Sequence, residues 1–178
     1  MRFDNTFETY YWKPTIIVII IRKLLMNDSS KDTLVQTQNW FLKAVPSPTS
    51  KNISTQIGCH LEEVVEMLEE LAPNSEEAYD TLHNAIAALT ELSELMKSSD
   101  KEVYAPNSNR LAILDALADQ IVTATGIGTF LGMNVPGALT EVNRSNYSKF
   151  EDGEPVFNEN KKVMKGKDYT PPDLTPFI

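Results

Sequence analysis

The sequence contains few of the residues that build disulfides or zinc sites. Cys59 is the only cysteine, so no disulfide can form within one chain, and a reducing compartment such as the cytoplasm is expected. Two histidines, far from any zinc-ligand spacing, argue against a zinc site. The β-branched run from Thr15 to Ile21 is too short to cross a bilayer, which needs about 20 apolar residues. We therefore expect no membrane partner.

Basic residues are also scarce. The 178-residue chain has 16 Lys and Arg against 25 Asp and Glu, which gives a net charge of −9 and a pI near 4.7. This balance argues against general affinity for nucleic acid. An acid-rich chain favours oxygen-ligated cations, hence magnesium or manganese. The length suits one domain, and 42% apolar content is enough for a core.

Residues 1–25 differ in character from the rest of the chain. They are aromatic and polar up to Trp12, and the β-branched run that comes next is flanked by Lys13, Arg22 and Lys23. The segment could be a buried strand, a weak membrane-surface anchor, or no part of the working protein. We favour a dispensable extension with Met26 as the true start, because the next residues are polar like an ordinary N-terminus.

The rest of the chain has the apolar spacing of amphipathic helices. Prolines, polar loops and an N-cap at Ser75 divide it into a leading helix and four main helices. We expect these helices at residues 34–45, 56–72, 76–98, 110–132 and 136–150. The expected fold is all-α, with a four-helix-bundle core in residues 26–150.

Residues 151–178 are expected to extend the same domain without helices. Residues 155–157 and 162–164 flank a polar turn and suggest a small β-hairpin. From Tyr169 the sequence is too rich in proline for a helix or an inner strand. We expect an extended arm that lies over the domain or over its neighbour.

The first group of candidate site residues lies on one acidic helix. The stretch from His60 to Leu71 carries Glu62, Glu63 and Glu66 on one side and apolar residues on the other. By itself this pattern is typical of an amphipathic helix with a solvated acidic face. The alternative is half of a carboxylate cage for a hard divalent cation, which needs more acids on a second helix.

A second pair of acids lies on the most apolar helix. Asp115 and Asp119 are the only charges between Arg110 and Glu141, and apolar residues cover nearly every direction round this helix. Such a helix is buried, either in the bundle or in a subunit interface. Buried carboxylates are costly unless they are paired or bound to metal. The sequence favours a metal cage with the acidic helix over pairing with a basic residue of a neighbouring helix, such as Lys43, Lys97 or Lys149.

Polar residues occur near the end of the last helix. Asn143, Asn146 and Lys149 are spaced three apart and can line one helical edge. Amides and an ammonium group could hold phosphate oxygens or a base edge, although a solvated helix end looks similar. The lysines of the tail could close over a polyanionic substrate or form a soluble turn; they are Lys161, Lys162, Lys165 and Lys167.

In this order, the three groups of residues resemble the motifs of the all-α nucleoside triphosphate pyrophosphohydrolases, the superfamily of MazG, all-α dUTPases and phosphoribosyl-ATP pyrophosphohydrolase. The Glu-Glu-x-x-Glu motif of that superfamily is matched at Glu62, Glu63 and Glu66. Its Glu-x-x-Asp motif is matched at Asp119, whereas Ala116 replaces the glutamate and Asp115 is the candidate substitute. The stretch from Asn146 to Phe150 resembles the third, Asn/Lys motif.

Residues from about Thr33 onward are similar to the branch of this superfamily found in phages and prophages. The likeness is carried by three phrases, which run from Asp115 to Val122, from Glu141 to Asn146 and from Tyr169 to Leu174.

The resemblance implies a magnesium-dependent hydrolase that splits a nucleoside triphosphate into a monophosphate and pyrophosphate, in nucleotide-pool control or phage nucleotide metabolism. It implies metal ligands at Glu63, Glu66, Asp119 and Asp115, and activation of water by Glu62. It implies substrate contacts from Asn146, Lys149 and Asn143, and a homodimer or homotetramer. The alternative is a non-catalytic helical module that binds metal or another protein.

Overall fold

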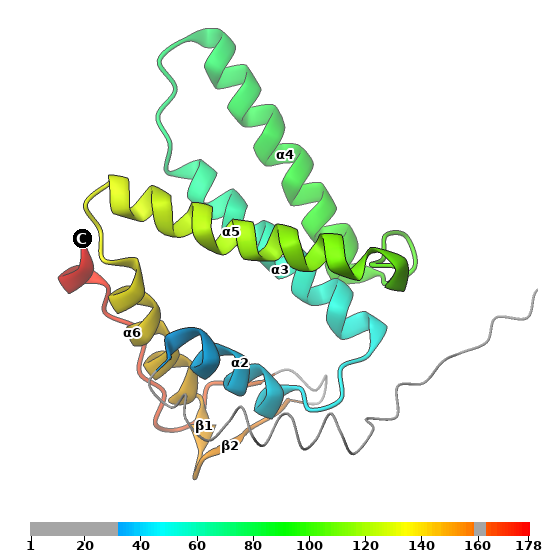
Figure 1. The fold of residues 1–178 in the computed structure, drawn as a ribbon, viewed down its shortest axis with the longest axis vertical. Coiled ribbons are helices and arrows are strands. Elements are labelled where there is room, and N and C mark those ends of the chain that lie inside the picture. Colours follow the sequence, from blue (N-terminus) through cyan, green and yellow to red (C-terminus); the bar gives the residue numbers. More distant parts are fainter. Residues whose placement is uncertain (1–31, 159–162) are drawn as a thin grey trace, which may run out of the picture. The chain divides into compact units, whose positions relative to one another are not determined.

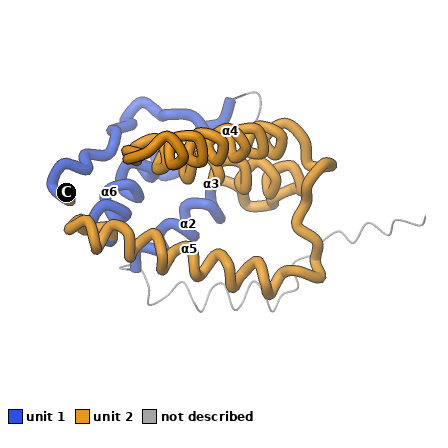
Figure 2. The backbone as a smooth tube through the Cα atoms, turned by 90° about the horizontal axis from the view of Figure 1, so that it is seen from above, with its two compact units in different colours: residues 1–43, 136–176 blue, residues 44–135, 177–178 orange. Residues whose placement is uncertain are grey.

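The computed structural model describes residues 32–158 and 163–178, and their fold is shown in Figure 1. The described residues divide into two compact units (Figure 2): unit 1 comprises residues 32–43, 136–158 and 163–176, and unit 2 comprises residues 44–135 and 177–178. The described residues are mostly helical with a small two-stranded sheet, which confirms the all-α class. The predictions for residues 1–25 and for a start at Met26 lie outside the described residues.

Unit 1 is built on helices α2 (Thr33–Ala44) and α6 (Val135–Tyr147). The aromatic ring of Trp40 on α2 stacks on that of Phe150, with centroids 5.8 Å apart, and its indole N–H donates to the carbonyl of Asn146 at 2.9 Å. Burial of a large ring with its polar group satisfied stabilises such a contact. The leading helix that the sequence predicts is therefore confirmed, and it is fixed to α6.

A two-stranded antiparallel sheet comes after α6. Strands β1 (Phe150–Glu151) and β2 (Glu154–Pro155) pair across a turn at Asp152 and Gly153. Both turn residues have positive φ, 51° and 80°, which a two-residue hairpin of this kind requires. The expectation that the last helix reaches residue 150 is wrong, because the chain has already left α6 to form β1.

The hairpin expected at residues 155–157 and 162–164 is present only in part. Phe157 and Val163 form an isolated antiparallel bridge, and the amide of Met164 donates to the carbonyl of Val156 at 2.7 Å. The regular strands lie earlier in the chain than expected. After this bridge the arm is irregular except for one 3-10 turn, η2 (Thr175–Phe177).

Unit 2 begins with a tightly packed helical hairpin of α3 (Ser50–Glu69) and α4 (Glu76–Ser98). Small residues let the two backbones approach: the hydroxyl of Ser54 donates to the carbonyl of Met96 at 2.7 Å, and that of Ser93 to the carbonyl of Gly58 at 2.8 Å. A Cβ on Gly58 would lie only 2.7 Å from the carbonyl oxygen of Ser93. This contact therefore accepts no larger residue without a shift.

Capping residues fix the first turns of α3 and α4. Helix α3 starts six residues before the predicted position, because Thr49 and Asn52 form a reciprocal capping box. Ser75 caps α4 as predicted, with its side chain accepting the amide of Ala78.

The most apolar helix, α5 (Arg110–Phe130), comes after a short 3-10 turn, η1 (Asn107–Asn109). The expectation that α5 is buried in a bundle is wrong for a single chain: most of its large apolar side chains are exposed, including Leu111 at 80% and Phe130 at 92%. The physical reason is that apolar residues on every side of α5 define no single face for packing against a neighbour.

Candidate functional site

The acidic motif of α3 lies on its solvent side. Glu62, Glu63 and Glu66 are all exposed, as an acidic helix face predicts. Among the described residues, the one ion pair of these carboxylates joins Glu62 to Lys97 of α4 at 2.9 Å. That contact raises the pKa of Lys97, chiefly through its hydrogen bond to Glu62. The carboxylates of Glu63 and Glu66 therefore remain open to a ligand from solvent.

The three carboxylates also act on one another. Partial burial raises the pKa of Glu63, and the negative charges of Glu66 and Glu62 raise it further, while His60 opposes them. The like charges of Glu66 and Glu62 disfavour ionisation of Glu63, and a cation bound at this face of α3 would offset that repulsion.

The second acidic pair, Asp115 and Asp119, lies on α5 and is exposed. The expected burial of these two carboxylates is therefore wrong for a single chain, because the helix that carries them is itself uncovered. The described contact between α3 and α5 is a hydrogen bond between the ring of His60 and the side-chain amide of Gln120. Gln120 directly follows Asp119, and His60 stands two residues before Glu62, so the contact joins the neighbourhoods of both motifs.

The carboxylates do not form a closed cage in one chain. Within residues 32–158 and 163–178, no three His, Cys, Asp or Glu side chains gather closely enough to hold a metal ion. The carboxylates of α3 and α5 therefore lie on two helices that contact each other, but they do not converge on one metal site.

The three polar residues of the last motif lie in unit 1 and differ in their surroundings. Asn143 is only 2% exposed; its amide donates to the carbonyl of Thr33 and accepts from the hydroxyl of Thr37, both at 2.9 Å. Both ends of the amide therefore tie α6 to α2, which is a structural role. Asn143 therefore does not line an open helix edge together with Asn146 and Lys149, contrary to the expectation from their spacing.

Asn146 and Lys149 are half-buried and contact each other. The ammonium group of Lys149 donates to the side-chain oxygen of Asn146 at 2.7 Å, and it lies 5.7 Å from the ring centroid of Trp40. Of the three candidates, these two present a cation and an amide that a phosphate could reach.

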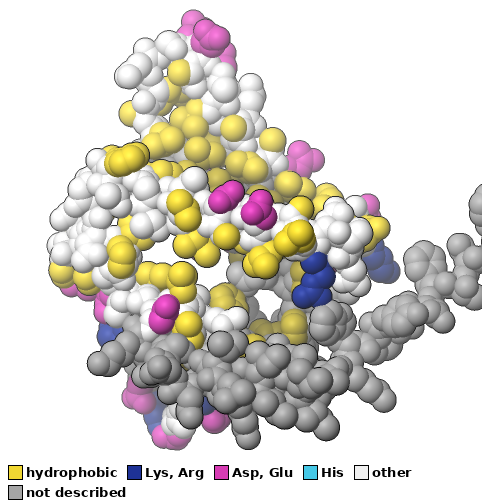
Figure 3. All heavy atoms as spheres, in the orientation of Figure 1, with side chains coloured by type: hydrophobic (Ala, Val, Ile, Leu, Met, Phe, Trp, Pro, Cys, Tyr) yellow, Lys and Arg dark blue, Asp and Glu magenta, His cyan; other side chains and the backbone are white. Residues whose placement is uncertain are grey.

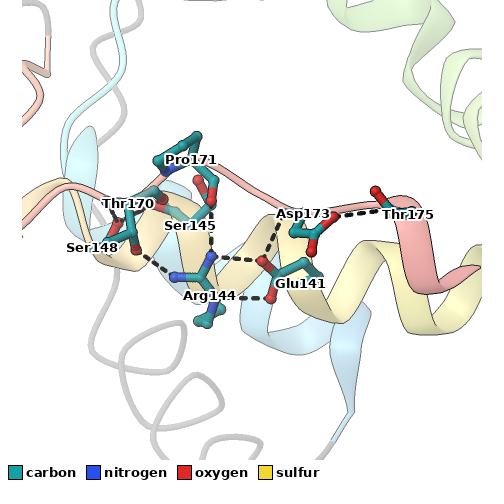
Figure 4. Close-up of polar contacts among 8 residues, drawn as sticks. All are labelled: Glu141, Arg144, Ser145, Ser148, Thr170, Pro171, Asp173 and Thr175. Atoms are coloured by element: carbon teal, nitrogen blue, oxygen red, sulfur yellow. Dashed lines mark hydrogen bonds and ion pairs between the residues drawn. The ribbon is translucent and has the colours of Figure 1, made fainter.

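A polar clamp that sequence reasoning missed holds the C-terminal arm on α6 (Figure 4). The guanidinium of Arg144 binds both carboxylate oxygens of Glu141, at 2.6 and 2.8 Å, and donates to Thr170 and to the carbonyl of Pro171. The amide of Asp173 donates to Glu141 at 3.0 Å. These contacts lower the pKa of Glu141 to about 2, first through Arg144 and then through the amide of Asp173. The opposite charges three residues apart were visible in the sequence, but their partners in the arm were not.

Comparison with known proteins provides no further assignment. No protein-family model, no curated protein and no solved structure matches this chain. A function for this chain therefore has to be inferred from its geometry and its sequence motifs.

Proposed function

We propose that this protein is a magnesium-dependent nucleoside triphosphate pyrophosphohydrolase that releases a nucleoside monophosphate and pyrophosphate. The observation that carries the proposal is the contact between His60 and Gln120, which joins the helix of the Glu-Glu-x-x-Glu motif to the helix of Asp115 and Asp119. Five carboxylates on two touching helices offer the hard oxygen ligands that magnesium, or manganese, prefers.

Each acidic residue has a proposed role. Glu63, Glu66, Asp119 and Asp115 would hold the cation, which would supply positive charge to offset the charge that develops on the phosphate. Glu62 would orient or deprotonate the attacking water, for which it must leave its ion pair with Lys97. Desolvation is the main cause of the raised pKa of Glu63, and the charges of Glu66 and Glu62 add to it; a cation at this face would offset that added repulsion.

The substrate residues come from the third motif. Lys149 and Asn146 would grip phosphate oxygens, as a cation and an amide donor. Asn143, given the hydrogen bonds of its amide, would act by fixing α6 rather than by touching the substrate. The protein would work in the cytoplasm as a homodimer or homotetramer, with the four-helix core of the MazG-like type completed by association.

Substitution of Glu66 by Gln tests the proposal. The change removes one metal-ligating charge from an exposed position and leaves side-chain size unchanged, so α3 should fold normally. We expect pyrophosphate release from a nucleotide panel with magnesium to fall by about 100-fold or more, in line with the several kcal/mol that metal-ion catalysis supplies.

The matched control is Glu69→Gln, the same substitution three residues later on α3 and outside the motif. We expect this variant to turn over at the rate of the unaltered chain. Normal turnover by Glu66→Gln, with the helical circular dichroism unchanged, would defeat the proposal.

A non-catalytic helical module is the second candidate, and the exposure of α5 favours it. A helix with so much exposed apolar surface is suited to binding another protein, with or without a structural metal. The two candidates differ in thermal stabilisation. The enzyme predicts that a nucleotide adds to the stabilisation by magnesium, whereas the module predicts that no nucleotide adds to it.

A further inference from the structure

Lys97 is the cation that lies beside the acidic motif of α3. Helices α3 and α4 carry two Lys or Arg residues, Lys51 and Lys97, and the charged side chains seen along most of α4 in Figure 3 are acidic. The ammonium group of Lys97 lies 2.9 Å from Oε1 of Glu62, whereas that of Lys51 donates to the carbonyl of Lys97. For an anion that approaches Glu63 or Glu66, the nearest cation of this hairpin is therefore Lys97.

The stem of Lys97 is held against the backbone of α3. A Cβ on Gly58 would lie 2.7 Å from Cγ of Lys97, so the stem occupies the space that a side chain at this position would need. Glu62 stands four residues after Gly58, about 40° round the helix and thus on nearly the same face. The packed stem therefore directs the ammonium group along this face toward the motif, while its end keeps the freedom of a flexible side chain.

The ion pair between Lys97 and Glu62 is weak enough to be exchanged. The two side chains are 30% and 49% exposed, and ion pairs in such surroundings change an equilibrium constant by about fivefold or less. A terminal phosphate group carries about −1.5 to −2 charges and three acceptor oxygens, more than a carboxylate does. A polyphosphate placed beside the pair would therefore compete effectively for the ammonium group.

The same ion pair restrains the residue to which the activation of water is assigned. Oε1 of Glu62 accepts a hydrogen bond from the ammonium group of Lys97, so this oxygen is a poorer acceptor for an attacking water. Movement of the ammonium group from Glu62 to phosphate would remove this restraint when the substrate arrives.

We propose that Lys97 binds the polyphosphate of the substrate and thereby releases Glu62 to act on water. In the free protein the ammonium group pairs with Glu62, and in the complex it pairs with phosphate oxygens. Lys97 is thus a substrate ligand that none of the three sequence motifs contains. The release of Glu62 rests on the proposed function, whereas phosphate binding by Lys97 is measurable without turnover.

The kinetic test uses Lys97→Met, which keeps a stem against Gly58 and removes the charge. With magnesium and the nucleotide that the unaltered chain hydrolyses best, KM should rise about 10- to 100-fold, as expected for loss of a hydrogen bond between charged groups. The value of kcat should change less than about threefold, because the contact exists before and during the reaction. Lys97→Arg, which keeps the charge, should return KM to within about fivefold of the original value.

The matched control is Lys51→Met. It removes the same charge from the same hairpin, at a residue whose ammonium group binds the end of α4 rather than the acidic motif. KM and kcat of this variant should equal those of the unaltered chain.

Binding of α,β-imido deoxynucleoside triphosphates, which resist cleavage between the α- and β-phosphates, tests the exchange itself. Glu62→Gln removes the competitor for Lys97 and should bind these analogues about two- to fivefold more tightly. In the Lys97→Met background the gain from Glu62→Gln should be smaller, because only relief of repulsion between Glu62 and phosphate remains. In the unaltered chain, the side-chain nitrogen resonance of Lys97 should shift when an analogue is added. This last measurement needs no variant, so it decides the matter if Lys97→Met fails to fold.

The outcomes distinguish the role of Lys97 from the proposed function. An unchanged KM in Lys97→Met, an equal loss in Lys51→Met, or a Lys97 resonance that ignores the bound analogue would overturn the role of Lys97 and leave the hydrolase standing. An equal gain from Glu62→Gln in both backgrounds would overturn the exchange. Analogue binding that depends on Lys97, without pyrophosphate release by the unaltered chain, would keep phosphate binding and remove the hydrolase. Absence of both binding and turnover would remove both.

Discussion

Helix α6 of unit 1 and helix α5 of unit 2 are neighbours in the sequence and differ in how they are held. Side chains of α6 bond to α2 across more than a hundred residues, through Asn143 and through Tyr147, whose hydroxyl donates to the carbonyl of Gln36 at 3.1 Å. Helix α5 has one described hydrogen bond to α3, through Gln120, and a broad uncovered surface. A helix with a few specific polar contacts is thus fixed within one chain, while a more apolar helix is not.

The difference results from the directionality of the two interactions. A buried hydrogen bond requires its partner at one distance and angle, so each polar side chain of α6 selects a position on α2. The hydrophobic effect is non-directional, and apolar residues on all sides of α5 select no unique neighbour. Apolar content alone therefore predicts that a surface is covered, but not by which part of which chain.

The largest effect is expected for Asn143→Ala, which removes one of the contacts that tie α6 to α2. The variant loses two part-buried hydrogen bonds to α2 and leaves a small cavity, so the free energy of unfolding should fall by about 2–4 kcal/mol. Urea unfolding monitored by Trp40 fluorescence, in a Trp12→Phe background, reports on unit 1.

The control for this variant is Thr140→Ala, at an exposed hydrogen bond between Thr140 and Thr33 on the same pair of helices. Loss of an exposed hydrogen bond should cost no more than about 0.5 kcal/mol, like other surface substitutions. Equal destabilisation by the two variants would contradict the structural role given to Asn143.

Two glycine-to-alanine substitutions in unit 2 should change the free energy of unfolding by smaller amounts and in opposite directions. At Gly58 the new Cβ would meet the backbone of α4 at 2.7 Å, so Gly58→Ala should destabilise by about 1–3 kcal/mol. At Gly126 on α5 nothing lies within 4 Å of the Cβ, so Gly126→Ala should stabilise by about 0.5–1 kcal/mol through helix propensity. Thermal unfolding followed by circular dichroism measures both, and destabilisation at Gly126 would show that α5 is covered there.

Local patterns predicted the helices but not how they pack. The N-cap at Ser75, the prolines after α2 and the apolar spacing placed the helices within a few residues, apart from the early start of α3 at the Thr49 capping box. Those features act within one or two turns of the chain, so they can be read from neighbouring residues. The site depends on longer distances.

For the candidate site, the sequence predicts which residues share a helix face but not which of them are buried. Spacing correctly placed Glu62, Glu63 and Glu66 on one exposed face of α3. It could not show that Asn143 would be buried against α2, nor that Asp115 and Asp119 would be exposed in a single chain. Burial depends on which other helix arrives at that face, and residues three or four apart carry no information about that.

The smallest expected effect concerns the clamp between α6 and the C-terminal arm. The contacts of Glu141 with Arg144 and Asp173 lower its pKa from 4.5 to about 2. A carboxylate with a lowered pKa in the folded state stabilises that state above the unfolded pKa, and loses this contribution as pH falls through the folded value. The clamp should therefore be complete above about pH 4.5 and weaken progressively toward pH 2.

The side-chain carbon resonance of Glu141 should titrate with a midpoint near 2, and the Nε–H resonance of Arg144 should change with it. In Arg144→Gln, which removes the largest cause, the midpoint should rise toward 4.5. A midpoint near 4.5 in the unaltered chain would mean that the arm leaves α6 in solution, and the contrast between a fixed α6 and an uncovered α5 would then hold for the contacts with α2 alone.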